Sequence, residues 1–210
     1  MITCEHTVFI VDDDQAVRDS LALLMNSVGL DAELYPSAQL FLDTYDPNRP
    51  GCLIADVRMP GMSGLELQQR LVERGIDIPL IIITGHGDVP MAVRAMKAGV
   101  VDFIEKPFDD QVLLDRVHSS IKKDAQAREE KNKHATLLAR LNALSSRERE
   151  VMELIVSGKV GKEIAWELGI SPKTVDVHRA HLLEKLQVNS IAELVRLAIT
   201  IGGDQVNEEA

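Results

Sequence analysis

Residues 7–14, TVFIVDDD, decide the fold of the first half of the chain. A short run of apolar and β-branched residues ends there in three consecutive aspartates, Asp12, Asp13 and Asp14. An unbroken run of this kind is typical of a strand that is buried on both faces of a parallel sheet. Because adjacent carboxylates repel one another, we expect either a bound cation or a helix N-terminus with free N–H groups at this position.

Comparable runs recur as far as residue 105. They lie at 52–56 (CLIAD), 80–84 (LIIIT) and 100–105 (VVDFIE), with a weaker one at 31–35 (DAELY). The segments that alternate with them have helical periodicity, and they lie at 15–28, 37–44, 64–74, 88–98 and 109–120. This alternation of strands and helices predicts an α/β doubly wound sheet of five parallel strands.

The residues that end the apolar runs are the ones to inspect, because doubly wound sheets bind ligands beyond the carboxyl ends of their strands. Here those ends carry the aspartates 12–14, Asp56, Thr84 and Lys106. A single acid at a strand end is common and indicates little. Carboxylates, a hydroxyl and an ammonium along one edge of a sheet indicate a functional site.

Three motifs around these residues, VDDDQAVR (11–18), ADVRMPGMSGLEL (55–67) and ITGHGDVPMAVRAMKAGVVDFIEKPF (83–108), resemble the receiver domain of two-component response regulators. The resemblance covers about residues 5–122 and implies the strand order 2-1-3-4-5. It also implies that Asp56 accepts a phosphoryl group from a sensor histidine kinase. A carboxylate is a usable nucleophile for such a covalent intermediate.

The same resemblance implies a magnesium site and a switch. Magnesium prefers oxygen ligands and retains several waters. The positions that match the family's metal ligands are Asp12, Asp13, Asp56 and the main-chain carbonyl of Arg58. The positions that match its other functional residues are Thr84 and Lys106, which contact the phosphoryl oxygens, Phe103, which reorients with the threonine, and Pro107, a cis proline that aims the lysine. Asp14 is left to cap the first helix.

An enzymatic alternative starts from the same aspartates. Asp12-x-Asp14 also fits the opening of haloacid-dehalogenase-type phosphohydrolases, and Asp109–Asp110 resembles their late acidic pair. That pair, however, follows Lys106 by only three residues, no cap insertion is present, and ADVRMPG would be unexplained. We therefore favour a phosphoacceptor protein that is not an enzyme in its own right.

Residues 109–144 contain neither proline nor glycine, and their middle part, KKDAQAREEKNKHA, has few apolar residues. One reading is a flexible tether. The other is a solvated helix that extends from the receiver, supported by i,i+4 pairs such as Glu129–Lys133. We favour the helix and expect a helical linker over residues 123–141.

Residues 142–203 have the pattern of a helix-turn-helix domain. Ser145 and Glu148 form an S-x-x-E capping box. The four predicted helices begin at Ser145, at residue 162, at Ser171 and at Ser190. The second and third are joined by a tight turn, GIS, as in helix-turn-helix proteins.

The third of these helices has an inward apolar stripe, Val175, Leu182, Leu183 and Leu186, and an opposite face suited to DNA. The candidates for contact with base edges are Asp176, Val177 and Ala180. The candidates for contact with phosphates are Lys173, Thr174, His178, Arg179, His181 and Lys185. The segment 142–203 resembles the LuxR/NarL/FixJ-type DNA-binding domain, although Asp176 replaces a common lysine and Gly161 a frequent asparagine.

The charge distribution fits this division of the chain. The net charge of −10 comes mainly from residues 1–120, with 19 acidic and 9 basic residues, whereas residues 142–201 carry 8 of each. A neutral DNA-binding domain has modest non-specific affinity, so we expect a homodimer on paired half-sites. No apolar segment approaches the roughly 18 residues of a membrane span, and we expect a cytoplasmic protein with no membrane contact.

Together these features resemble a FixJ-type response regulator, with a receiver (1–122), a helical linker (123–141), a DNA-binding domain (142–203) and an acidic tail (204–210). The resemblance implies that phosphorylation activates binding to promoter DNA, with RNA polymerase as the further partner. The rival interpretation is a phosphorylation-independent helix-turn-helix regulator with a vestigial receiver. The intact set of acidic residues argues against it.

Overall fold

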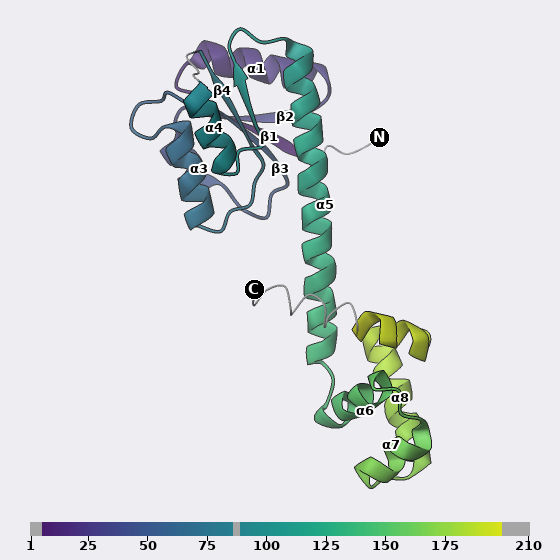
Figure 1. The fold of residues 1–210 in the computed structure, drawn as a ribbon. Helices are drawn as coiled ribbons and strands as arrows, with labels where there is room; N and C mark the ends of the chain where they lie inside the picture. Colours follow the sequence, from purple (N-terminus) through teal and green to yellow (C-terminus); the bar gives the residue numbers. More distant parts are fainter. Residues whose placement is uncertain (1–5, 86–88, 199–210) are drawn as a thin grey trace. The chain divides into compact units, whose positions relative to one another are not determined.

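The computed structural model describes residues 6–85 and 89–198 (Figure 1). The chain forms two compact units, Met1–Glu130 and Lys131–Ala210. Within the described ranges, no helix is long and apolar enough to cross a membrane. The predicted acidic tail, 204–210, lies outside the described residues.

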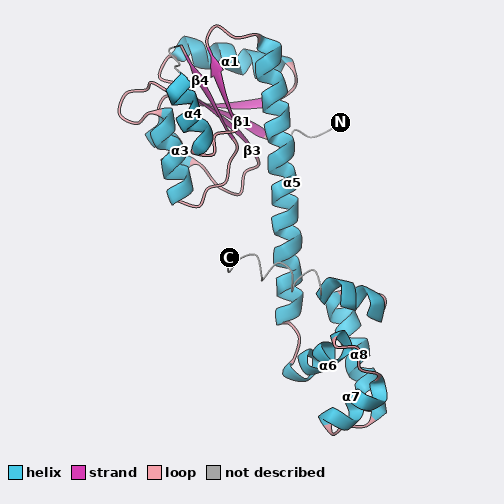
Figure 2. Cartoon of the chain, in the orientation of Figure 1, coloured by secondary structure: helices cyan, strands magenta, loops and turns pink. Residues whose placement is uncertain are grey.

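The first unit contains a sheet of five parallel strands, which Figure 2 shows in magenta. The strands are β1 (Thr7–Val11), β2 (Asp31–Tyr35), β3 (Gly51–Asp56), β4 (Leu80–Thr84) and β5 (Asp102–Glu105). Their order, β2-β1-β3-β4-β5, confirms the predicted topology. The last strand is shorter than the predicted run 100–105, because residues 100 and 101 still belong to the connection from the preceding helix.

Five helices of this unit follow the strands in turn. They are α1 (Gln15–Ser27), α2 (Ala38–Thr44), α3 (Gly64–Glu73), α4 (Val89–Lys97) and α5 (Asp110–Asn142), the last of which continues past the end of the unit. Alternate residues of each strand point to opposite faces. Phe9 packs in the core that includes residues of α2 and α3, whereas Ile10 packs in the core that includes residues of α1 and α5. Burial on both faces explains why the strand sequences are unbroken apolar runs.

The connector is helical throughout, since α5 runs without interruption from Asp110 to Asn142. The tether alternative therefore does not describe residues 123–141. The absence of proline and glycine and the abundance of good helix formers account for the continuity.

The second unit contains α6 (Ser146–Val156), α7 (Gly161–Leu168) and α8 (Pro172–Leu186), followed by helical residues 191–198. Ser145 and Glu148 form the predicted capping box, and the Ser171 side chain caps α8 by accepting from the Thr174 N–H. Gly169 ends α7 in the left-handed conformation, with φ of 63°. A glycine takes this φ without the steric cost that a side chain would add.

Glu148 connects α6 to α8. Its side chain is only 5% exposed and accepts hydrogen bonds from the Ser145 N–H at 2.8 Å and from Lys185 Nζ at 2.7 Å. The hydrogen bond from Lys185, followed by those from Ser145, outweighs burial and lowers the pKa of Glu148 to about 2. Lys185, which we predicted to contact phosphate, thus has a partner within its own unit.

Glu148→Gln tests this connection. A carboxylate whose pKa is lowered by folding stabilises the protein above its unfolded-state pKa, and this contribution is lost as the group is protonated. We therefore expect the wild-type unit to lose stability as pH falls from about 4.5 towards 2. The variant should be less stable at neutral pH and lack most of this pH dependence. Urea titrations followed by far-ultraviolet circular dichroism of the helices measure both effects.

The matched control is Glu150→Gln, which removes an acid of the same helix that is 45% exposed and pairs with Arg147. This control should keep the wild-type pH profile, because exposed ion pairs contribute little. Identical profiles for the wild type and Glu148→Gln would contradict the assignment.

Candidate functional site

The carboxyl ends of three neighbouring strands bring the predicted site residues together. Asp12 follows β1, Asp56 ends β3 and Thr84 ends β4. Val11 lies beside Ala55, and Asp56 lies beside Ile83, so these strands end at nearly the same level. All three residues are buried, with residue exposures of 2% for Asp12, 8% for Asp56 and 1% for Thr84.

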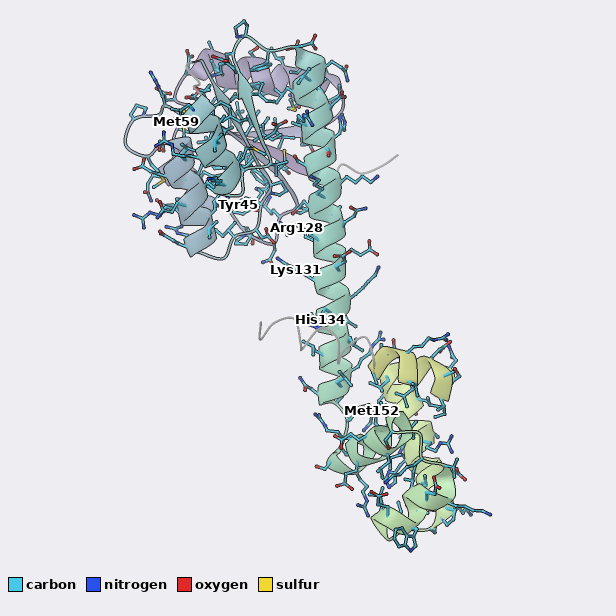
Figure 3. All side chains as sticks on the ribbon, in the orientation of Figure 1. Tyr45, Met59, Arg128, Lys131, His134 and Met152 are labelled. Carbon is cyan, nitrogen blue, oxygen red and sulfur yellow. The ribbon has the colours of Figure 1, made fainter. Side chains whose placement is uncertain are left out.

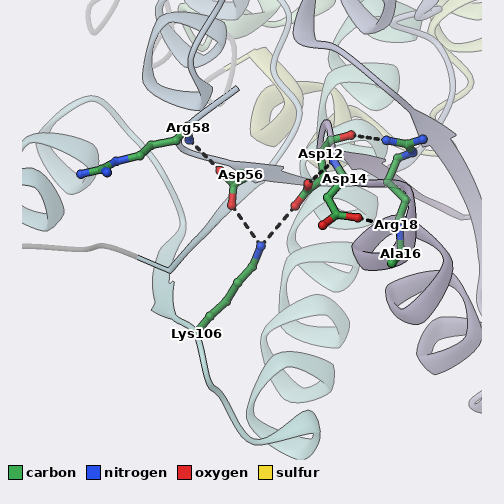
Figure 4. A network of polar contacts seen from close by, with 7 residues as sticks. All are labelled: Asp12, Asp14, Ala16, Arg18, Asp56, Arg58 and Lys106. Atoms are coloured by element: carbon green, nitrogen blue, oxygen red, sulfur yellow. Dashed lines mark hydrogen bonds and ion pairs between the residues drawn. The ribbon is translucent and has the colours of Figure 1, made fainter. Parts of the chain in front are cut away.

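Lys106 bridges the two buried carboxylates, as Figure 4 shows. Its Nζ lies 3.0 Å from Asp56 Oδ1 and 3.2 Å from Asp12 Oδ2. The main chain fixes the lysine in this place, because the Lys106 N–H donates to the Thr84 carbonyl at 2.7 Å. The Lys106–Pro107 peptide is cis, as predicted.

Burial and the neighbouring charges shift the pKa values of Asp12 and Lys106. Burial raises the pKa of Asp12 above its ordinary value. Burial alone would lower the pKa of Lys106, but its hydrogen bond to Asp56 and the negative charges of Asp12 and Asp56 together hold it above its ordinary value. Lys106 is therefore a fixed ammonium at neutral pH. An anionic group added to Asp56 would lie next to this positive charge and be stabilised by it.

The three consecutive aspartates, Asp12, Asp13 and Asp14, have different environments. Asp14 caps α1, since its Oδ1 accepts from the Ala16 N–H at 2.8 Å, which confirms the prediction. Asp12 turns inward to Lys106 and also accepts from the Asp14 N–H at 2.9 Å. Asp13 is exposed, and its role as a metal ligand stays a prediction.

The oxygen atoms of this edge are suited to magnesium. Asp12 and Asp56 converge, and the Arg58 N–H donates to Asp56 Oδ2 at 2.6 Å, which holds residue 58 next to the carboxylate. Among the described residues, no three acidic, histidine or cysteine side chains gather closely enough to form a metal site by themselves. Magnesium needs only one or two carboxylates, because it retains waters in its octahedral shell. The two carboxylates fit that requirement, and the Arg58 carbonyl stays a predicted ligand.

Two residues of the site escaped the sequence analysis. Arg18, one turn into α1, donates to the Asp12 carbonyl at 2.6 Å and fixes the chain where it leaves β1. Gly64 begins α3, and a Cβ at this position would lie 2.4 Å from the Asp56 carbonyl oxygen. Its sequence signal was a glycine directly after the helix-capping Ser63, within the motif 55–67.

Phe103, the predicted switch aromatic, lies on β5 beside Ile82 of β4. It is partly buried and packs against the core that includes residues of α2 and α3. A side chain between core and surface has room to change its rotamer, whereas Thr84 is fully enclosed.

The second candidate site is the exposed face of α8. Val175, Leu182 and Leu186 are buried, as the predicted inward stripe requires. Val177 is 46% exposed, and Lys173, Asp176, Ala180 and His181 are exposed with it. Thr174, His178 and Arg179 are half-buried. The face thus presents small apolar side chains among charged ones, and the individual DNA contacts stay predictions.

Comparisons with known proteins find relatives of both units. Residues 8–118 match the response regulator receiver domain, and residues 142–198 match the bacterial regulatory proteins of the luxR family. The transcriptional regulatory protein FixJ of Azorhizobium caulinodans is 47% identical over 195 residues, which cover 93% of this chain and 92% of that protein. The response regulator protein TodT of Pseudomonas putida is 45% identical over 190 residues, covering 90% of this chain and 84% of TodT.

Solved structures of response regulators also match this chain. The response regulator StyR matches with a TM-score of 0.90 at 44% identity, over 93% of this chain and 99% of that chain. Full-length FixJ from B. japonicum matches with a TM-score of 0.58 at 44% identity, over 95% of this chain and 98% of that chain.

Gly64→Ala tests the packing of α3 on the Asp56 main chain. The added methyl must displace the backbone at the end of β3, so we expect a loss of about 1–3 kcal/mol in the free energy of unfolding of the first unit. Gly85→Ala is the control, because a Cβ at position 85, next to the same site, meets no atom within 4 Å. Urea denaturation measures both. Equal stability of the two variants would contradict the close approach of Gly64 to Asp56.

Proposed function

This chain belongs to the two-component response regulators that combine a receiver with a LuxR-type DNA-binding domain, and we propose that phosphorylation of Asp56 controls its binding to DNA. Its relatives are transcriptional regulators and not enzymes, which sets the phosphohydrolase alternative aside. The observation that carries the proposal is the Lys106 ammonium held between the carboxylates of Asp56 and Asp12.

The phosphoryl group comes from a phosphohistidine of the sensor kinase. A carboxylate oxygen of Asp56 attacks phosphorus, an acyl phosphate forms, and the phosphorus–nitrogen bond of the donor breaks. Such a transfer depends mainly on alignment and on neutralising the equatorial oxygens. Lys106 is already in place to contact one of them. Magnesium, held by Asp12, Asp13, Asp56 and the Arg58 carbonyl, would neutralise further charge when bound.

The modification is read out at the end of β4. The Thr84 hydroxyl donates to a phosphoryl oxygen, and Phe103 on the neighbouring strand follows its movement. This shifts the receiver towards a second conformation in which two receivers pair. The resulting homodimer places two DNA-binding domains on paired half-sites of a promoter, where RNA polymerase is the next partner.

DNA recognition rests on α8. In helix-turn-helix proteins the second helix of the motif enters the major groove. Val177 and Ala180 are small enough to let the backbone of α8 approach base edges, and Asp176 can accept from cytosine N4. Lys173, exposed at the start of the helix, contacts phosphate.

Asp56→Asn tests the phosphoacceptor. With acetyl phosphate and magnesium, the wild type should gain the mass of one phosphoryl group, and the variant should gain none because an amide is not a nucleophile for this transfer. Intact-mass spectrometry, with peptide mapping of the product, makes the measurement. Asp43→Asn removes an acid from α2 and should label like the wild type. Labelling of the Asp56→Asn variant, or a wild type that stays unlabelled as in a vestigial receiver, would contradict the assignment.

Lys173→Ala and Val177→Ala separate the two kinds of DNA contact. The lysine variant should bind all sequences more weakly and reduce the salt slope of binding by about 1. The valine variant should instead change the preference among sequences. Affinity measured on randomised half-sites at several salt concentrations distinguishes them. A sequence-specific effect of Lys173→Ala would overturn its assignment to phosphate.

A further inference from the structure

An ion pair links α5 to the end of the sheet opposite to Asp56. Asp124 lies beyond residues 8–118, which match the receiver family, yet it is only 3% exposed. Its Oδ2 accepts from the main-chain N–H of Gly51 at 2.9 Å and from Arg128 Nε at 2.8 Å. Burial, and to a lesser degree the Asp124 carboxylate, raises the pKa of the neighbouring Cys52 thiol to about 12.

Arg128 completes the connection. Its Nη1 donates to the Pro47 carbonyl at 2.9 Å and its Nη2 to the Arg49 carbonyl at 3.0 Å. Figure 3 labels Arg128 close to Tyr45, whose hydroxyl also donates to the Arg49 carbonyl, at 3.1 Å. The planar guanidinium therefore joins a carboxylate of its own helix to two carbonyls of the loop before β3. We call Asp124 and Arg128, with their partners in residues 47–51, the polar clamp.

The polar clamp lies just beyond the part of α5 that packs against the apolar core of the first unit. Ile121 is the last residue of α5 that packs against the core of the first unit. From 122 to 130 the side chains are exposed or half-buried except Asp124. Helices in proteins gain most of their stability from tertiary contacts, and this polar stretch of α5 has few of them. The contacts of Asp124 and Arg128 are thus the main link between this segment and the body of the receiver.

The polar clamp and the phosphoacceptor also share a strand. β3 begins at Gly51, which donates to Asp124, and ends at Asp56. Gly51 cannot carry a side chain, because its Cβ would lie 1.9 Å from the Thr7 carbonyl oxygen. The start of this strand is therefore held tightly against β1 at the place where Asp124 docks.

We propose that the polar clamp holds residues 122–130 helical on the receiver, and that this hold is required for phosphorylation of Asp56 to change DNA binding. The second part rests on the proposed function. Without the clamp, α5 frays from about Ile121 onward, and a frayed segment is a tether that transmits no change from the receiver. Asp124 and Arg128 are positioning residues, since neither touches the phosphoryl site.

The test uses full-length Arg128→Lys and Arg128→Ala, with Lys123→Ala as the matched control. Lysine keeps the charge but not the forked geometry of the three contacts. Lys123 is an exposed basic residue of the same helix. Hydrogen exchange of the amides 122–130, phosphorylation by acetyl phosphate, and DNA affinity with and without phosphorylation are measured on each protein.

Both Arg128 variants should label at Asp56 like the wild type, which shows that the receiver is folded. Their amides 122–130 should exchange about tenfold faster or more, because hydrogen bonds to charged groups are lost. The ratio of DNA affinities with and without phosphorylation should fall towards one, while the Lys123 control keeps the wild-type ratio and exchange.

Wild-type exchange rates in both Arg128 variants would overturn the clamp's hold on the helix. Faster exchange with a wild-type affinity ratio would overturn its role in coupling. If the wild type itself shows no effect of phosphorylation on DNA affinity, the proposed function and the coupling role fail together. The exchange data then still decide the hold on the helix.

Discussion

The receiver depends on one electrostatic arrangement, the Lys106 ammonium between the carboxylates of Asp56 and Asp12. Two buried carboxylates at one edge of a sheet repel each other and lose solvation, and the ammonium offsets part of both costs. Three features hold these groups in place. The parallel register brings the strand ends to the same level, the Thr84 carbonyl accepts from the Lys106 N–H, and Arg18 fixes the turn after β1. A phosphoryl group or a magnesium ion bound at this edge would change the balance between the two carboxylate charges and the ammonium.

The strand β3 connects the phosphoacceptor site to the polar clamp at its other end. Asp56 lies at its carboxyl end, and the Gly51 N–H at its start binds the Asp124 carboxylate. The same helix whose first turns bury Leu113 and Val117 against the sheet thus continues into a segment held by charge. Directional hydrogen bonds fix such a segment in one orientation, whereas a few small apolar contacts would let it slide. The polar clamp thus suits the role proposed for it, which is to keep residues 122–130 helical on the receiver.

The strands and the site edge could be predicted because each follows from a local pattern, whereas the strand order came from the resemblance to receiver domains. Burial on both faces makes the apolar runs unbroken, and the strands then end just before Asp12, at Asp56 and at Thr84. Gly64 and the polar clamp could not be predicted, because their meaning lies in contacts with distant segments. Asp124 and Gly51 are 73 residues apart, and in the sequence Asp124 is one charge in a charged helix. For the same reason Lys185 was predicted only as a phosphate contact, although it binds Glu148, 37 residues away.

The central claim is that the state of Asp56 sets the affinity for DNA. Beryllofluoride with magnesium occupies a phosphoacceptor carboxylate without a kinase, so the dissociation constant for promoter DNA can be measured on one sample before and after its addition. A coupling of ordinary size predicts that the full-length protein binds about fivefold or more tightly afterwards, and that Asp56→Asn shows no change. An unchanged dissociation constant in the wild type, with beryllofluoride bound at Asp56, would contradict the account.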